Sequence, residues 1–206
     1  SSLSSSSSSG HKKEDLVIDI AKYVKAWKPE ERDSEWLDKE EFMSIMLWMG
    51  WLDQDRSVEV FEMAKPDADA KTVSCKILQD MFCTSLCLIN MVDLPARMTA
   101  ASQWWHLEDP EKMSQADAKR FLFSFFFIGS YIIGSVVADH RFHSVSSANV
   151  ISLVESIWES TSTVSEDKTM PQSNFITWFS VNIKDFPKWL RKMQRDIKRY
   201  HIKQRM

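Results

Sequence analysis

EERDSEWLDKEEF, residues 30–42, contains a polar loop, a single hydrophobic residue, Leu37, and then the start of a helix. Asp38 can cap that helix with its side chain, and Glu41, three residues later, can bond back to the cap. The same order of features recurs three more times, in PDADAKTVSCKIL (66–78), LEDPEKMSQADA (107–118) and SEDKTMPQSNF (165–175). The sequence therefore predicts four helix–loop–helix units.

These segments resemble the helix–loop–helix unit of the EF-hand superfamily, to which calmodulin and the neuronal calcium sensors belong. In that family the hydrophobic residue at the eighth loop position pairs with the neighbouring loop in a short sheet. Here that position falls on Leu37, Val73, Met113 and Met170, at intervals of 36, 40 and 57 residues. The resemblance implies backbone pairing of Leu37 with Val73 and of Met113 with Met170.

Composition favours an all-α fold. The chain has only four Gly and six Pro among long stretches with helical periodicity, and 44% hydrophobic residues are ample for a packed core. We expect a disordered Ser-rich tail over 1–12, EF-hand-like pairs over 13–93 and 94–186, and a basic helix over 187–206. The first pair would begin with an amphipathic helix over 14–27.

FLFSFFFIGSYIIGSVV, residues 121–137, contains no charged residue. It is shorter than the ~20 apolar residues that span a bilayer, so we expect a long, buried central helix. Gly129 and Gly134 would permit close helix crossings. Contact of this segment with a membrane stays open at this point.

The four loops lack several of the residues that an EF-hand loop uses to bind Ca²⁺. A working EF-hand loop supplies oxygen ligands from alternate positions, glycine at position 6 and a bidentate Glu at position 12. All four loops lack the glycine, and the third positions include Arg32 and Ala68. Calcium is the only cofactor that the resemblance suggests, and we expect no tight site for it. The weak candidate ligands are Glu108, Asp117, Glu41 and Asp167.

The cysteines indicate a reducing compartment. Cys75, Cys83 and Cys87 are odd in number and lack CxxC spacing, which is typical of reduced thiols in a cytosolic protein. No signal peptide is visible at the start of the sequence, and we expect a cytoplasmic location.

Charge is distributed unevenly. Residues 187–206 contain eight Lys or Arg and one Asp, whereas the remaining chain has 18 basic and 28 acidic residues. The acidic body argues against a nucleic-acid binder, and the basic helix is typical of calmodulin targets and of helices on membrane surfaces. This helix could dock on its own body, contact acidic protein or lipid, or do both. Its basic residues include Lys188, Arg191, Lys192, Arg195, Lys198 and Arg199.

No phosphate loop, metalloprotease motif or nucleophile elbow occurs, so we expect no enzymatic activity. The favoured hypothesis is an EF-hand-like module that binds a partner's amphipathic helix largely without Ca²⁺. The alternatives are a calcium sensor with one or two weak sites, and an unrelated helical adaptor whose basic tail contacts acidic protein or lipid. The candidate partner-binding residues are Met43, Met46, Trp48, Trp51, Trp189, Met193, Ile197 and Tyr200.

Overall fold

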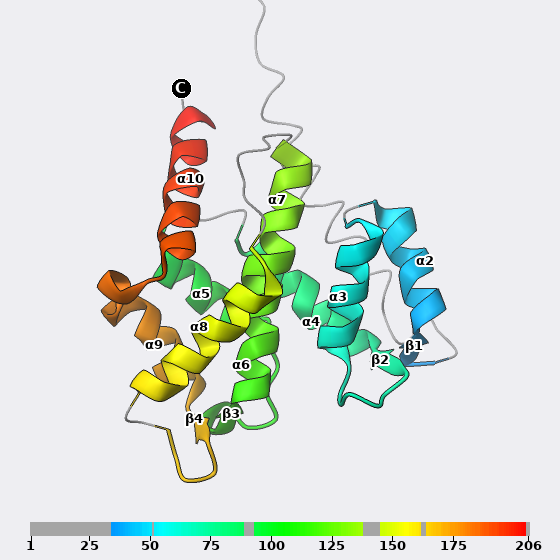
Figure 1. Cartoon of the computed structure of the whole chain (residues 1–206), viewed down its shortest axis with the longest axis horizontal. Coiled ribbons are helices and arrows are strands. Elements are labelled where there is room, and N and C mark those ends of the chain that lie inside the picture. Colours follow the sequence, from blue (N-terminus) through cyan, green and yellow to red (C-terminus); the bar gives the residue numbers. More distant parts are fainter. Residues whose placement is uncertain (1–33, 51, 89–92, 138–144, 162–163, 205–206) are drawn as a thin grey trace, which may run out of the picture.

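The computed structural model describes residues 34–50, 52–88, 93–137, 145–161 and 164–204. The predicted tail over 1–12, the predicted helix over 14–27 and Trp51 lie outside the described residues. The described chain is predominantly helical, which confirms the all-α prediction. Its α-helices are α2 (Lys39–Met49), α3 (Gln54–Ala64), α4 (Cys75–Leu86), α5 (Leu94–Ser102), α6 (Gln115–Leu122), α7 (Gly129–Val137), α8 (Ser147–Ser160), α9 (Gln172–Val181) and α10 (Lys188–Gln204) (Figure 1).

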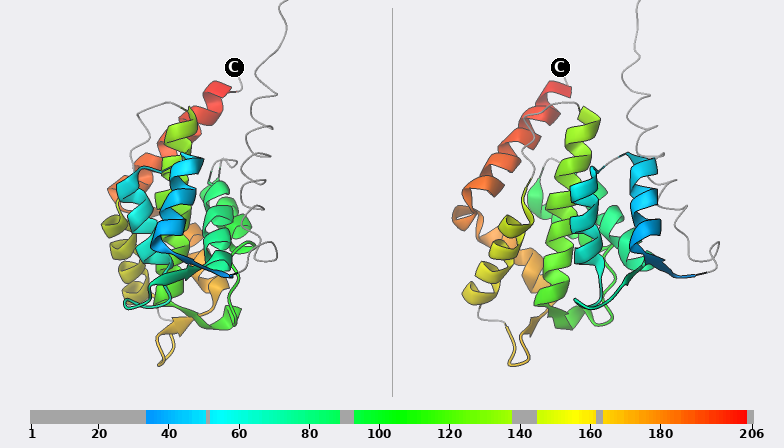
Figure 2. Two further views of the ribbon diagram at one scale, coloured as in Figure 1. Left: turned by 90° about the vertical axis from the view of Figure 1, so that its right-hand side faces the viewer. Right: turned by 45° about the vertical axis from the view of Figure 1, so that its right-hand side comes forward.

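Two short antiparallel sheets join the loops. Strand β1 (Trp36–Asp38) pairs with β2 (Thr72–Ser74), so that Leu37 faces Val73 across the ladder. Strand β3 (Met113–Ser114) pairs with β4 (Thr169–Met170), so that Met113 faces Met170. These are the two backbone pairings expected from the sequence, and all four hydrophobic side chains are buried. Both sheets lie toward the end of the molecule opposite the C-terminal end of α10 (Figures 1 and 2).

The helices around the two sheets are arranged alike. Helices α2 and α6 follow directly after β1 and β3, while α3 and α8 lead into β2 and β4. In the first half α2 packs on α3, and in the second half α6 packs on α8. Helix α5 also packs on α9. The order of strand and helix around β3 and β4 thus resembles that around β1 and β2, except that the second half has additional helical residues between α6 and α8.

Capping residues explain where these helices begin and end. Asp38 and Glu41 form the predicted capping box, in which the Glu41 amide donates to Asp38 Oδ1 at 2.8 Å. Gly50 ends α2 with φ +64°, a left-handed conformation that glycine adopts without a steric penalty. Ser74 stands at the N-cap of α4 without a side-chain capping bond. The first amide of that helix instead donates across the sheet to the Glu35 carbonyl at 2.9 Å.

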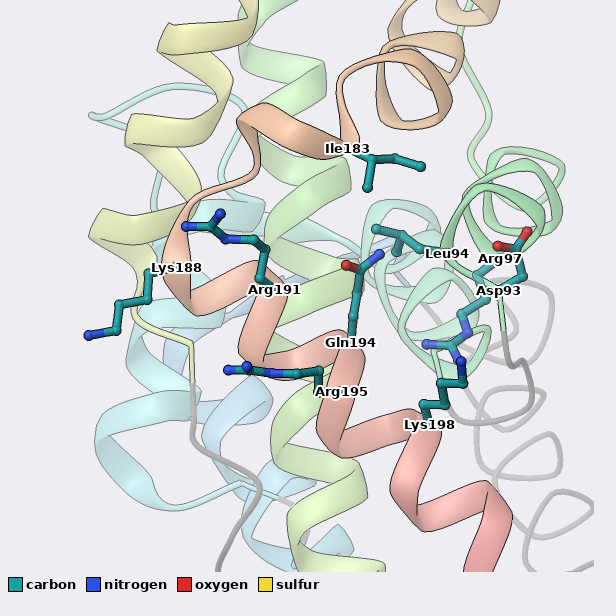
Figure 3. A pocket seen from close by; sticks show the side chains of 9 residues that line it. All are labelled: Asp93, Leu94, Arg97, Ile183, Lys188, Arg191, Gln194, Arg195 and Lys198. Carbon is teal, nitrogen blue, oxygen red and sulfur yellow. The ribbon is translucent and has the colours of Figure 1, made fainter.

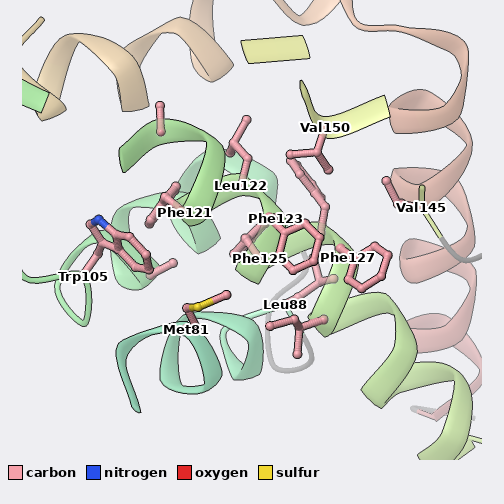
Figure 4. Packing of buried hydrophobic residues seen from close by; sticks show 14 of the residues in the cluster. Met81, Leu88, Trp105, Phe121, Leu122, Phe123, Phe125, Phe127, Val145 and Val150 are labelled. Carbon is pink, nitrogen blue, oxygen red and sulfur yellow. The ribbon is translucent and has the colours of Figure 1, made fainter. Parts of the chain in front are cut away.

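The predicted central helix is a continuous helical run through α6, a π-helical segment Phe123–Ile128 and α7. All six residues of the π-helical segment are fully buried, since neighbouring helices cover every side of it. Figure 4 shows Met81 of α4 and Leu88 facing this phenylalanine-rich segment. The buried Ser124 hydroxyl donates to the Arg120 carbonyl at 2.7 Å, which satisfies it within the helix. Within the described ranges, no helix has the length and apolar character needed to cross a membrane.

The two predicted glycine crossings differ. A Cβ at Gly129 would lie 2.9 Å from Leu88 Cδ2 and 3.0 Å from the Ser85 carbonyl oxygen, so the close approach expected there is observed. At Gly134 the prediction of a close crossing is wrong, because no described atom lies within 4 Å of an added Cβ.

Contacts across the predicted boundary at residues 93 and 94 join the two halves. Buried residues from both sides form one hydrophobic cluster. The Arg120 guanidinium of α6 donates to the carbonyls of Met63 at 3.3 Å and Lys65 at 2.9 Å, at the end of α3. His106 Nδ1 also lies 3.0 Å from Asp80 Oδ1 on α4.

Candidate functional site

The apolar stripe of α10 packs on the body of its own chain. Leu190, Met193 and Ile197 are buried in the hydrophobic cluster. Trp189 is half-buried and meets Phe126 of the π-helical segment edge-on, with ring centroids 5.4 Å apart. Two of the predicted partner-binding residues, Met193 and Ile197, are therefore occupied by contacts within the chain. The side chain of Tyr200 lies outside the described part.

Helix α2 divides its predicted partner-binding residues between the core and the surface. Met46 is buried beside the core, and Met43 is half-buried. In contrast, Trp48 is 69% exposed, and Leu47, which the sequence analysis did not select, is 83% exposed. No local pattern marks Leu47 as exposed, because its neighbours Met46 and Trp48 are also apolar.

Three of the four candidate calcium ligands accept local hydrogen bonds. Asp117 accepts from the Ser114 amide at 3.2 Å and from its hydroxyl at 2.6 Å, in the capping box of α6. Glu41 accepts from the Asp38 amide at 3.4 Å. Asp167 accepts from the hydroxyls of Ser165 and Thr169, and these bonds lower its pKa below the ordinary value.

The cavity at the third loop is lined by both acidic and basic side chains. Its volume is about 410 Å³, and its lining includes four carboxylates (Asp80, Glu108, Asp109 and Asp117) and three cations (Lys76, Lys112 and Arg120). The three positive charges offset most of the negative charge, so this cavity attracts a divalent cation less strongly than carboxylates alone would. Across the described segments, no three His, Cys, Asp or Glu side chains are grouped in a way that could hold a metal ion.

A basic cleft of about 690 Å³ lies where α10 passes α5 and the short 3₁₀ helix η4 (Ile183–Asp185). Figure 3 shows Gln194 and Lys198 extending from α10 on the side of the cleft where Asp93 and Arg97 lie. The predicted basic residues Lys192 and Arg199 do not line this cleft. The residues that do are Asp93, Leu94, Arg97, Ile183, Lys188, Arg191, Gln194, Arg195 and Lys198.

The sequence analysis did not identify Arg97, although a signal was present. Helix α5 reads LPARMTAAS, in which Arg97 is the one charged residue among small and apolar neighbours. A single charged residue on an otherwise apolar helix either reaches solvent or is buried, and a buried charge needs a compensating partner. Here the structure buries it.

Comparison with protein-family models, with curated proteins and with solved structures finds no match for this chain.

Proposed function

We propose that this chain is a non-enzymatic interaction module of EF-hand-like architecture, which binds a basic amphipathic helix of a partner protein without requiring Ca²⁺. The architecture is supported by the pairing of Leu37 with Val73 and of Met113 with Met170. It is supported further by the same order of helix, strand and helix in the two halves. Paired loops of this kind hold two helices apart and leave an apolar surface between or beside them.

The observation that carries the proposal is the exposed apolar end of α2. Leu47 and Trp48 lie next to each other in sequence and are exposed, in a chain that buries most of its large hydrophobic side chains. Adjacent exposed hydrophobic residues often mark a surface for a partner.

Charge on the same face of α2 defines the partner. Glu40 is exposed about two turns before Leu47 on the same side of the helix. A helix that places apolar residues on the apolar end and Lys or Arg on the acidic end would match both properties.

Helix α10 is itself a basic amphipathic helix, and it packs on the other helices of its own chain. It buries Leu190, Met193 and Ile197 and leaves Lys188, Arg191 and Arg195 exposed. The surface under α10 is already covered by α10. We therefore propose that the partner helix binds at α2. Independence from Ca²⁺ is supported by Pro66, Ala68 and Ala70 in the second loop and by the cations around the third.

A display library of amphipathic helical peptides, selected against the intact chain in EDTA, tests the proposal. We expect basic amphipathic peptides that lose binding when Leu47→Glu is introduced. Val181→Glu is the matched control, because Val181 is 73% exposed and lies on α9. Peptides that bind only after Ca²⁺ is added, or that bind the Leu47 variant as tightly as the parent chain, would contradict the proposal.

A further inference from the structure

Arg97 is a buried cation for which the described residues provide no hydrogen bond or ion pair. Its side chain is 2% exposed, although it lines the cleft between α5 and α10. Its guanidinium forms no hydrogen bond or ion pair with the rest of the described chain, and its Nε atom is buried and unsatisfied. In Figure 3 the guanidinium extends from α5 toward Lys198 of α10.

Among the described residues that line the cleft, the one carboxylate, Asp93, also caps a helix. Asp93 is the N-cap of α5, and its Oδ2 atom accepts from the Ala96 amide at 3.2 Å. Burial lowers the pKa of Arg97 to about 10, and the negative charge of Asp93 only partly opposes that effect. Arg97 is therefore still protonated at neutral pH, and its charge is not compensated by a bound carboxylate. An unpaired buried charge is costly unless an opposite charge joins it.

Four more cations line the same cleft. Helix α10 contributes them at a spacing of three or four residues. In Figure 3 Lys198 extends toward Arg97, whereas Lys188, Arg191 and Arg195 extend to the other side of α10. None of the four forms an ion pair with a described residue. The cleft thus combines five basic side chains with one acidic side chain. The four cations of α10 are Lys188, Arg191, Arg195 and Lys198.

We propose that this cleft binds clustered phosphate groups, with the Arg97 guanidinium donating to one phosphate at its buried end and the cations of α10 neutralising the others. The planar fork of arginine matches the oxygens of phosphate, and five cations call for a ligand with several negative charges. A volume of about 690 Å³ suits a small molecule that carries two or three phosphates. A soluble polyphosphate compound and a phosphorylated lipid headgroup share this chemistry.

Calorimetric titration of the intact chain with inorganic tripolyphosphate, at physiological salt, tests the site. We expect saturable binding that Arg97→Met weakens by at least about tenfold, since each hydrogen bond between charged groups is worth that much or more. Arg199→Met is the matched control, because Arg199 lies on the same helix and is absent from the cleft lining. We expect it to change the affinity less than about twofold, because an exposed charge at a distance is screened.

A second pair of variants keeps the test informative if Arg97→Met does not fold. Arg191→Met with Arg195→Met removes two cleft cations, and Lys192→Met with Arg199→Met removes two cations of α10 outside the cleft. The first pair should weaken tripolyphosphate binding far more than the second. Equal losses would mean that the charge of α10 attracts phosphate without a site, which would overturn the proposal.

Vesicles distinguish the two sources of phosphate. The intact chain is mixed with phosphatidylcholine vesicles that contain either a phosphatidylinositol bisphosphate or phosphatidylserine. Binding to the bisphosphate vesicles that depends on Arg97 assigns the cleft to a lipid headgroup, whereas tripolyphosphate binding alone assigns it to a soluble compound. No binding in either arm, or binding that Arg97→Met leaves unchanged, overturns the site. Because the cleft is remote from α2 (Figure 1), either result leaves the proposed partner surface to its own test.

Discussion

Asp80 shows how burial changes a single ionisable group in this chain. Its carboxylate lies 3.0 Å from His106 Nδ1, which links α4 to the segment after α5. Burial raises the pKa of Asp80 above its ordinary value, and the hydrogen bond from His106 only partly opposes the rise. The folded state therefore binds a proton more readily at Asp80 than the unfolded state does.

This shift predicts the pH dependence of an Asp80→Asn variant. The charged carboxylate weakens folding above the raised pKa, and this penalty disappears as the pH falls through it toward 3.8. We expect the variant to be more stable than the parent chain at pH 7 and to lose that advantage toward pH 4. Urea unfolding of both proteins at several pH values measures the difference. If the stability advantage of Asp80→Asn instead grew as the pH fell, the raised pKa of Asp80 would be contradicted.

The half-buried cysteines should react slowly. Burial raises the pKa of both the Cys83 and Cys87 thiols to about 11. At pH 8 the reactive thiolate should be about 100-fold scarcer than for an ordinary thiol, so alkylation by iodoacetamide should slow accordingly. Mass spectrometry of native and urea-unfolded samples checks this expectation. Equal modification rates in the two states would show that these thiols are not protected by the fold.

Among the elements, the central helical run is the one whose packing is most sensitive to volume. Helix α4 lies along the π-helical segment and α7, and Gly129 allows Leu88 and the Ser85 carbonyl to approach closely. An added methyl group there must displace a backbone oxygen as well as a side chain. The contact therefore resists substitution more than an ordinary side-chain contact does.

Gly129→Ala should destabilise the fold by about 1–3 kcal/mol, because the new Cβ overlaps Leu88 and Ser85. Gly134→Ala is its control in the same helix, since no described atom lies within 4 Å of the added Cβ. That substitution should stabilise the fold by about 0.5–1 kcal/mol through helix propensity. Thermal and urea unfolding measure both changes. A Gly129 variant as stable as the parent would disprove the close crossing.

Features of the fold that depend on residues close together in sequence could be predicted. Leu37, Asp38 and Glu41 lie within five residues, and loop pairing and helix capping depend on such short patterns. The π-helical segment could not be predicted, because FSFFFI is apolar on every side and has no periodicity that distinguishes one helix type from another. Arg97 and Leu47 also escaped prediction. Whether each is covered depends on contacts with segments far away in sequence.

At the scale of the whole molecule, one hydrophobic cluster extends from the first loop pair to α10. Its members include Leu37 near the start of the described chain and Ile197 close to the end. Arg120 and the His106–Asp80 contact add polar links between the halves. A change at the C-terminal helix should therefore reduce the stability of the fold as a whole.

Ile197→Asp tests the docking of α10. A carboxylate in place of a buried isoleucine should cost about 2–5 kcal/mol, because apolar contacts are lost and a charge is buried. It should also release α10 and raise the fluorescence of a dye that binds exposed apolar surface. Lys192→Asp, a half-buried position on the same helix, should change the stability by less than about 1 kcal/mol. Unchanged dye binding in the Ile197 variant would argue against a docked α10.

The partner surface on α2 is the central claim, and the most direct measurement is the affinity of one selected basic amphipathic peptide for the intact chain. We predict the same dissociation constant in EDTA and in millimolar Ca²⁺, a loss of at least about tenfold with Leu47→Glu, and no comparable loss with Val181→Glu. Binding that requires Ca²⁺, or that Leu47→Glu leaves intact, would contradict the account.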